Sequence, residues 1–402
     1  MKGESTVSQM VVIGGGIAGL VLAASLGDGR ALTIYQEPRE ASGSGEGTAL
    51  ALAPNAMRVL RNLGIADRVA AFGTQIFEYQ ILNHRGQLLQ RVDLARLTKR
   101  WGEGFWCVPR SRLMAALALT ANAGRSLNSA EKLVAINPMG AGYALRFSDN
   151  STHFADYVVA ADGIHSLVRR SLGPVAEELQ YQGYFAFRGM ARISHLGWKP
   201  SSAFQIWGQG REFGYARMNA DYVYWYATWP SRSPEAILLP ARKWLQEAFA
   251  DWPESVGLLL DATSDRDVIV HPIYDLRQPA LYLTGAYTLI GDAAHPMTPN
   301  LGQGACQAMV DGWVLGSYLR RQSPISAFRR YEEERRPHVA QVMHWSRQMG
   351  RAIHVRPRWQ ACSRNLVLSR TPHWMMQAVV GRTLGRPESL GSLRPEHASA
   401  GK

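Results

Sequence analysis

The order of apolar and polar residues at the start of the chain predicts a strand, a tight turn, a helix and a second strand. Met10–Ile13 is a short apolar run, Ile17–Leu26 is an apolar helical stretch, and residues 31–35 again have strand character. A run of glycines joins the first strand to the helix. Strand, helix and strand in this order open a doubly wound sheet, so the expected fold class is α/β with a Rossmann-like domain.

Two later stretches change to the alternating pattern of strands with one buried face. Residues 73–91 alternate, and so do residues 185–229, where Tyr222, Tyr224 and Tyr226 share one face of a strand. A period of two is typical of antiparallel strands. We therefore expect an antiparallel sheet inserted into the Rossmann-like fold as a second domain.

The remaining pattern predicts a discontinuous first domain and a helical C-terminus. Apolar runs at 157–161 and 282–290 predict two more strands of the first domain. After Gly302 we expect a helix through about Leu319, then a segment at 328–336, then a helix with apolar residues at core spacing, and a last helix after Thr371-Pro372. The predicted boundaries are 1–73, 108–178 and 270–340 for the first domain, 74–107 and 179–269 for the sheet domain, 341–390 for C-terminal helices and 391–402 for a disordered tail.

Composition and charge describe an ordinary globular protein with one unusual segment. The 402 residues are 46% hydrophobic and 19% charged, with a net charge of +12. Ten arginines and no acidic residue lie between positions 335 and 386, which leaves 34 basic against 32 acidic residues elsewhere. This balance gives no reason to expect nucleic-acid binding. The basic segment is either a weak contact for an anionic membrane surface or a solvated helix face, and we favour the solvated face.

The cysteines and the N-terminal residues indicate where in the cell the protein is expected. Cys107, Cys306 and Cys362 are far apart and form no CxxC pair, so we expect neither disulfides nor a metal site, and a reducing cytoplasm fits best. The apolar stretch that begins at Met10 is broken by glycines, which argues against a signal peptide. No apolar run approaches membrane-spanning length.

The first chemical motif is the glycine run between strand and helix. Glycine permits the tight turn at Gly14, lets a phosphate approach at Gly16, and lets the helix pack closely on the strand at Gly19. The motif therefore predicts a dinucleotide pyrophosphate at the helix N-terminus, in contact with Gly14, Gly16, Ile17, Ala18 and Gly19. The acidic residue expected at the end of the second strand is replaced by Gln36 in strand register, or is Glu37 by count from the glycines.

Two further motifs follow the later strands. Asp162-Gly163 is an acidic residue and a turn glycine at a strand end, and Gly291-Asp292 repeats this arrangement. Residues 299–304 then open a helix, whose exposed N–H groups and dipole can stabilise negative charge. From this motif we expect Pro299, Gly302, Gln303 and Gly304 at the cofactor. Cys306 and His295 are more consistent with packing roles than with a nucleophile and a base.

In this order the three motifs resemble those of the class A flavin monooxygenases related to para-hydroxybenzoate hydroxylase. The resemblance runs from Val11 to about Pro387 and is strongest to the salicylate hydroxylase, urate hydroxylase and zeaxanthin epoxidase branch. It implies FAD as the cofactor, with Asp162 and Gly163 near its diphosphate, Asp292 near its ribityl chain, and Arg110 near the ribityl and phosphate groups. In the loop at 43–47, Gly47 is a further expected contact.

The resemblance also implies the chemistry. NAD(P)H, which has no Rossmann site of its own, would reduce FAD, and O2 would form a C4a-hydroperoxide whose terminal oxygen hydroxylates an aromatic or heteroaromatic small molecule. One alternative is an epoxidase or reductase of a polyene or lipid-like substrate. Another is a flavin-binding interaction protein without turnover. The oligomeric state is left open.

Three residues are expected on the substrate side of the inserted sheet. Arg188 lies in the Phe187-Arg188-Gly189 match, and Tyr224 matches a substrate-side tyrosine of urate-hydroxylating relatives. Arg217 stands where relatives usually have proline, and its guanidinium would either hold an anionic or carbonyl-bearing substrate or point to solvent.

Overall fold

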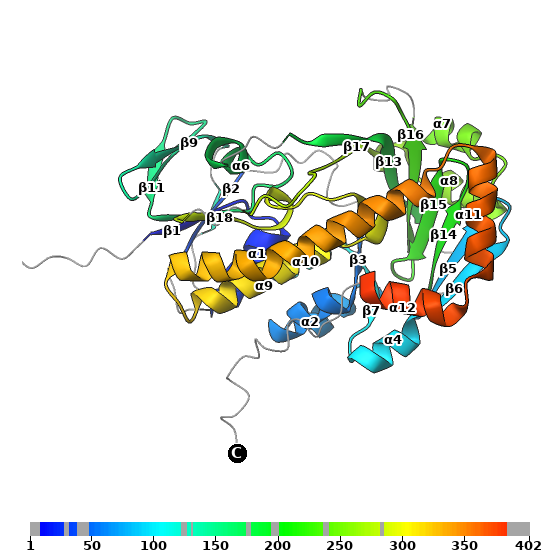
Figure 1. Ribbon diagram of the computed structural model, residues 1–402, viewed down its shortest axis with the longest axis horizontal. Helices are drawn as coiled ribbons and strands as arrows, with labels where there is room; N and C mark the ends of the chain where they lie inside the picture. Colours follow the sequence, from blue (N-terminus) through cyan, green and yellow to red (C-terminus); the bar gives the residue numbers. More distant parts are fainter. Residues whose placement is uncertain are drawn as a thin grey trace, which may run out of the picture.

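A computed structural model of the chain describes residues 9–27, 32–37, 48–121, 127–129, 132–173, 178–193, 201–235, 241–281 and 285–383. The described part combines a five-stranded parallel sheet, a seven-stranded sheet and two three-stranded sheets, with helices around them (Figure 1). The α/β class expected from the sequence is confirmed. The domain boundaries drawn from the sequence stay a prediction.

The parallel sheet contains the first motif at the end of its central strand. Its order is β18-β12-β1-β2-β8, and its strands are β1 (Met10–Ile13), β2 (Thr33–Gln36), β8 (Leu127–Ser129), β12 (Tyr157–Ala160) and β18 (Tyr287–Leu289). Val11 pairs with Val158 on one side and Thr33 on the other, and it is fully buried, as expected for a strand covered on both faces. The second strand begins at Thr33, and residues 31 and 282–284 of the expected strands lie outside the described residues.

Two small sheets and several short helices complete this half of the molecule. One sheet contains β3 (Ala49–Leu52), β7 (Phe105–Pro109) and β4 (Thr74–Ile76), and the other contains β11 (Thr152–Ala155), β10 (Gly142–Phe147) and β9 (Leu133–Met139). The helices are α1 (Ile17–Leu26), α2 (Pro54–Asn62), α3 (Ala66–Ala70), α4 (Leu94–Trp101), α5 (Arg110–Ala121) and α6 (Leu167–Leu172).

The seven-stranded sheet brings together both stretches of alternating sequence. In spatial order it contains β17 (Ile269–Asp275), β13 (Gln180–Arg192), β16 (Tyr222–Pro230), β15 (Glu212–Arg217), β14 (Ser202–Trp207), β5 (Glu78–Asn83) and β6 (Leu88–Asp93). The sheet is not wholly antiparallel, because β14 and β5 pair in parallel. Trp225 is fully buried in an apolar cluster with α7 (Ala241–Ala248) and α8 (Glu254–Asp261), whereas Tyr224, on the opposite face, packs against the core of the Rossmann-like half.

A long helix links the two halves. After α9 (Gly304–Leu319), α10 (Pro324–Ile353) runs from the parallel sheet to the seven-stranded sheet, where α11 (Arg358–Arg370) and α12 (His373–Thr383) follow (Figure 1). The sequence pattern predicted two segments here, but α10 is continuous through Pro337. Tyr331 and Val339, on either side of the proline, are both fully buried, so packing favours one helix over a break. Within the described chain, no helix combines the length and apolar character needed to cross a membrane.

Candidate functional site

The glycine turn after β1 is shaped to leave room for a ligand. Gly14 has φ +108°, and a Cβ there would lie 2.2 Å from the carbonyl oxygen of Ala161. A Cβ at Gly19 would lie 2.2 Å from the carbonyl oxygen of Gly14. At Gly16, which caps α1, a Cβ would meet nothing within 4 Å. Packing therefore requires glycine at positions 14 and 19. The space beside Gly16 is open, and it lies at the N-terminus of α1, where a pyrophosphate can accept hydrogen bonds from backbone N–H groups.

The end of β2 carries an amide in place of a carboxylate. A Cβ at Gly15 would lie 2.1 Å from the side-chain oxygen of Gln36, so Gln36 lies over the glycine turn. Glu37 is exposed. Contact of either residue with a ribose stays a prediction, and Gly47 lies outside the described residues.

The polar side chains of the second motif mainly hold neighbouring segments of the protein together. The Asp162 carboxylate accepts the backbone N–H groups of Leu167 at 2.8 Å and Val168 at 3.3 Å, which caps α6. Burial raises the pKa of Asp162, although these hydrogen bonds oppose the shift. Gly163 has φ +79°, and a Cβ there would meet nothing within 4 Å. Arg169 donates to the carbonyl oxygen of Ala293 at 2.7 Å and so ties this motif to the third.

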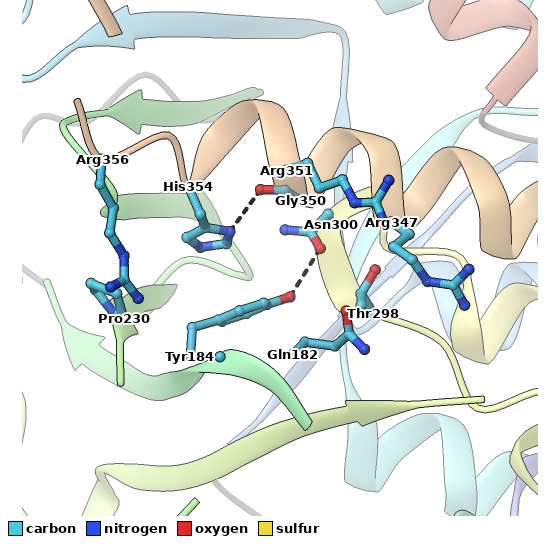
Figure 2. A pocket seen from close by; sticks show the side chains of 11 residues that line it. Gln182, Tyr184, Pro230, Thr298, Asn300, Arg347, Gly350, Arg351, His354 and Arg356 are labelled. Atoms are coloured by element: carbon cyan, nitrogen blue, oxygen red, sulfur yellow. Dashed lines mark hydrogen bonds between the residues drawn. The ribbon is translucent and has the colours of Figure 1, made fainter. Parts of the chain in front are cut away.

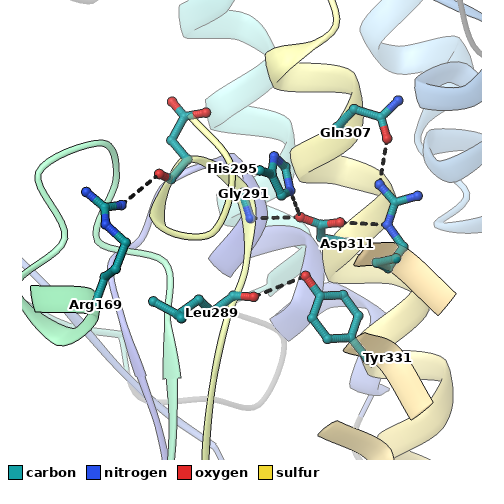
Figure 3. Close-up of polar contacts among 9 residues, drawn as sticks. Arg169, Leu289, Gly291, His295, Gln307, Asp311 and Tyr331 are labelled. Atoms are coloured by element: carbon teal, nitrogen blue, oxygen red, sulfur yellow. Dashed lines mark hydrogen bonds and ion pairs between the residues drawn. The ribbon is translucent and has the colours of Figure 1, made fainter. Parts of the chain in front are cut away.

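The third motif is held in place by one buried carboxylate. Asp311 in α9 accepts the Gly291 N–H at 2.8 Å, contacts His295 Nε2 at 2.5 Å, and accepts Arg335 Nε at 2.8 Å (Figure 3). Burial alone would raise the pKa of Asp311, but His295 and Arg335 together hold it well below the usual range. His295 is thus a buried partner of Asp311, which is consistent with the packing role expected from the sequence.

Asp292, which follows Gly291 in the third motif, has different surroundings from Asp311. It stays in contact with solvent although protein atoms surround it closely, and this desolvation raises its pKa against the opposing effects of His295 and Arg110. The electrostatic effect of Arg110 means that the fold brings this arginine, from the start of α5, close to Asp292. A carboxylate and a guanidinium that lie close together can bind the hydroxyl and phosphate groups of an extended cofactor.

The start of α9 leaves backbone N–H groups available. Residues 299–301 form a single 3-10 turn, Gly302 has φ +63°, and no side chain caps the helix. The Gln303 side chain accepts Asn55 Nδ2 at 3.1 Å and Gln307 Nε2 at 3.0 Å, so it braces the turn. Burial raises the pKa of Cys306 to about 11, which is inconsistent with a nucleophile at neutral pH. The loop geometry therefore suits stabilisation of negative charge by a helix N-terminus.

The seven-stranded sheet separates the three expected substrate-side residues. Tyr226 is paired with Arg188 and Tyr224 with Met190, so Arg188 and Tyr224 share the face that packs toward the Rossmann-like half. Arg217 is instead paired with Val223 on the other face, and its guanidinium donates to the carbonyl oxygens of Asn219 and Ala220. The structure therefore brings Arg188 and Tyr224 together and places Arg217 at the β15–β16 hairpin.

Arg188 is available for a ligand. It is half-buried and forms no hydrogen bond or ion pair with any residue that the structure describes. Its charge lowers the pKa of the Tyr224 phenol, but burial is the larger effect and the net shift is upward. Tyr224 is therefore a protonated hydrogen-bond donor at neutral pH.

A buried polar chain on the same face was missed in the sequence. Tyr226 donates to Glu212 Oε1 at 3.1 Å, Gln205 Nε2 donates to Tyr226 at 2.5 Å, and Tyr79 donates to Gln205 Oε1. Burial raises the pKa of Glu212 to about 7, against the effects of Tyr226 and Arg364. The available signal was a carboxylate at an inward position of an alternating strand.

The chain is similar to known FAD-dependent proteins. The FAD binding domain family matches residues 7–346. The 3-amino-4-hydroxybenzoate 2-monooxygenase PtnB3 of Streptomyces platensis is 34% identical over 358 residues, which cover 86% of this chain and 89% of the relative. The FAD-dependent urate hydroxylase of Klebsiella pneumoniae subsp. pneumoniae is 27% identical over 339 residues, with 81% and 85% covered.

Solved structures show the same fold. Klebsiella pneumoniae HpxO in complex with FAD and uric acid aligns with a TM-score of 0.83 at 24% identity, covering 95% of this chain and 98% of HpxO. A salicylate hydroxylase substrate complex aligns with a TM-score of 0.73 at 21% identity, covering 96% and 99%.

The chain belongs to the FAD-binding class A monooxygenase family. It is a flavin-dependent monooxygenase of the aromatic hydroxylase type. FAD is its cofactor, and NAD(P)H is the reductant typical of the family. The family expected from the sequence motifs is confirmed.

Proposed function

We propose that this enzyme hydroxylates a small aromatic or heteroaromatic compound that carries an anionic group, with NAD(P)H as reductant and O2 as the oxygen source. The observation that carries the proposal is the half-buried Arg188 guanidinium, which has no partner among the described residues and lies on the same sheet face as Tyr224. A half-buried cation without a partner favours an anionic ligand, because desolvation is offset only when the charge is paired.

The similarity to PtnB3 supports the same class of substrate. The compound in the name of that relative, 3-amino-4-hydroxybenzoate, is an aromatic carboxylate. We infer that Arg188 binds the substrate carboxylate and that Tyr224 donates a hydrogen bond to a ring substituent. Arg217 is left out of this assignment, since its guanidinium donates to carbonyl oxygens of its own hairpin.

We also propose which residues hold FAD. The open space at Gly16 would receive the pyrophosphate, Arg110 and Asp292 would contact the ribityl and phosphate region, and the turn around Gly302 would face the flavin ring. When bound, the flavin supplies reduction by NAD(P)H and activation of O2. The protein would position the substrate carbon, exclude water and stabilise negative charge at the N-terminus of α9.

The proposal is tested by following NADH and NADPH oxidation by the FAD-loaded protein with a matched panel. The panel pairs hydroxybenzoates and aminohydroxybenzoates with the corresponding uncharged amides, and adds purines and a polyene. Faster oxidation with the acids, together with one labelled oxygen from ¹⁸O2 in the product, supports the proposal. Turnover of the polyene alone would support the epoxidase or reductase alternative, and tight FAD binding without any stimulated oxidation would support the non-catalytic one.

A further inference from the structure

A cationic pocket lies beside the loop that precedes α9, on the side of α10. Its volume is about 270 Å³, and Figure 2 shows its walls coming from β13, the 298–300 loop and the C-terminal end of α10. The lining residues include Arg347, Arg351 and Arg356, and none of the lining residues is acidic. No sequence motif predicted this pocket, because its walls come from segments far apart in the chain.

One of the three arginines at this pocket forms an ion pair within the described residues. Burial raises the pKa of the nearby Asp275, and the charges of Arg347 and Arg351 oppose this shift. Arg347 donates to Asp275 Oδ2 at 2.8 Å and to the Leu276 carbonyl oxygen at 2.7 Å. The Arg351 and Arg356 guanidinium groups form no hydrogen bond or ion pair with the residues that the structure describes. His354 adds no charge, because burial lowers its pKa to about 4. Two unpaired guanidinium groups therefore remain at the pocket.

The side-chain amide of Asn300 places a buried hydrogen-bond donor in the wall of the same pocket. Tyr184 donates to Asn300 Oδ1 at 3.0 Å, and the Tyr184 ring stacks on His354 with centroids 4.1 Å apart (Figure 2). The amide nitrogen of Asn300 is buried and has no hydrogen-bond partner among the described residues. A Cβ at Gly350 would lie 2.7 Å from Asn300 Oδ1, so this glycine lets α10 approach the loop. An unpaired buried donor is costly, and an acceptor ligand would satisfy it.

We propose that this pocket binds a phosphoryl group. Arginine side chains pair with phosphate oxygens in a forked geometry, and two unpaired guanidinium groups match a dianion better than a single carboxylate. The volume is below the ~300–1,000 Å³ of sites that enclose a drug-sized ligand, so the pocket takes the phosphoryl end of a molecule. The same chemistry is offered by inorganic phosphate and by the phosphates of the nicotinamide cosubstrate.

The pocket adjoins the turn that precedes α9. Asn300 contributes to the pocket and also belongs to the 3-10 turn Pro299–Leu301 before α9. An acceptor bonded to the Asn300 amide would therefore fix the turn that, under the proposed function, faces the flavin ring. Only this link and the cosubstrate source rest on the proposed function, whereas phosphate binding itself does not.

The test is calorimetric titration of the FAD-loaded protein with inorganic phosphate and, separately, with NADP⁺, at ionic strength kept constant with NaCl. The variant is Arg351→Gln/Arg356→Gln, which changes two exposed side chains. The control is Arg336→Gln, an exposed arginine on the same helix about 22 Å from Arg351 along the axis. FAD content and melting temperature of each protein report on folding.

We expect saturable binding of one phosphate to the wild type and to Arg336→Gln, and at least tenfold weaker binding to the double variant. Absence of saturable binding in the wild type, or equal affinity in the double variant, would overturn the proposal. Competition between NADP⁺ and phosphate, with both weakened in the double variant, identifies the cosubstrate as the source. If the affinity for NADP⁺ changes neither with added phosphate nor in the double variant, the pocket is a site for free phosphate. These outcomes stand even if no substrate stimulates NAD(P)H oxidation, so a failure of the proposed function is distinguishable.

Discussion

The Asp311 carboxylate accepts the backbone N–H of Gly291, twenty residues earlier, at 2.8 Å. This hydrogen bond holds the turn that contains Asp292, and His295 and Arg335 contact the same carboxylate (Figure 3). A buried anion with three donors fixes a turn in one conformation. The shape of the third motif thus depends on residues outside it.

Loss of Arg335 should therefore destabilise the protein and release FAD. Arg335→Met leaves Asp311 without its guanidinium partner, and removal of one member of a buried pair costs about 3–5 kcal/mol. Urea unfolding and the FAD absorbance of the purified protein measure both effects. Arg336→Met, at the neighbouring exposed position, is the control and should change the free energy of unfolding by less than about 0.5 kcal/mol. Equal stability of the two variants would contradict this account.

Alanine at two glycines of the first motif should have opposite consequences. Gly16→Ala meets no protein atom within 4 Å and has extended backbone angles, so the apoprotein should fold normally while FAD affinity falls at least tenfold. Gly14→Ala clashes with Ala161 at φ +108°, so it should lower the melting temperature of the apoprotein itself. Differential scanning fluorimetry with and without FAD separates the two effects. Wild-type FAD affinity in Gly16→Ala would rule out the pyrophosphate assignment.

Arg188 and Arg217 should differ in their effect on substrate binding. A charge-assisted hydrogen bond contributes about 1.5–3 kcal/mol, so Arg188→Gln should raise KM for an acidic substrate roughly tenfold to hundredfold. Arg217→Gln should leave KM nearly unchanged, because its guanidinium donates to the Asn219 and Ala220 carbonyl oxygens. Steady-state NAD(P)H oxidation with the acid and its amide measures this. A larger effect from Arg217 would reverse the assignment.

Glu212 should make stability fall as pH rises. Its folded pKa of about 7 lies above the ordinary value of 4.5, so between these values the unfolded chain releases a proton that the folded chain keeps. The contribution of Glu212 is therefore present below pH 4.5 and lost as pH rises through 7, with a magnitude on the order of 3 kcal/mol. Glu212→Gln should gain stability relative to the wild type from pH 5 to pH 8. If the melting temperatures of Glu212→Gln and the wild type changed with pH in parallel, this account would be wrong. Glu247→Gln, at an exposed position, is the control.

Anionic vesicles should leave the protein in the supernatant at physiological ionic strength. Several arginines of the basic segment are engaged within the protein, including Arg335 with Asp311, Arg347 with Asp275 and Arg364 with the Ile353 carbonyl oxygen. Trp359 and Trp374 are about 70% exposed and would be the anchors if a membrane contact existed. Sedimentation with vesicles that disappears in Trp359→Ser/Trp374→Ser would show that our preference for a solvated face was wrong.

The sequence by itself determined the features that depend on local spacing. The turn at Gly14 and the order of the three motifs identified the FAD-binding fold, and the alternation around Tyr224 indicated a sheet with two distinct faces. These features are readable because each depends on a few neighbouring residues with a fixed period.

Only the tertiary structure decided which distant residues meet. Strand register put Arg188 and Arg217 on opposite faces, and packing on both sides of Pro337 kept α10 continuous. The partnership of Asp311 with Arg335 and the arginine pocket at Asn300 join segments far apart in the sequence. Such contacts depend on long-range pairing and on the direction of each side chain, which no local periodicity encodes.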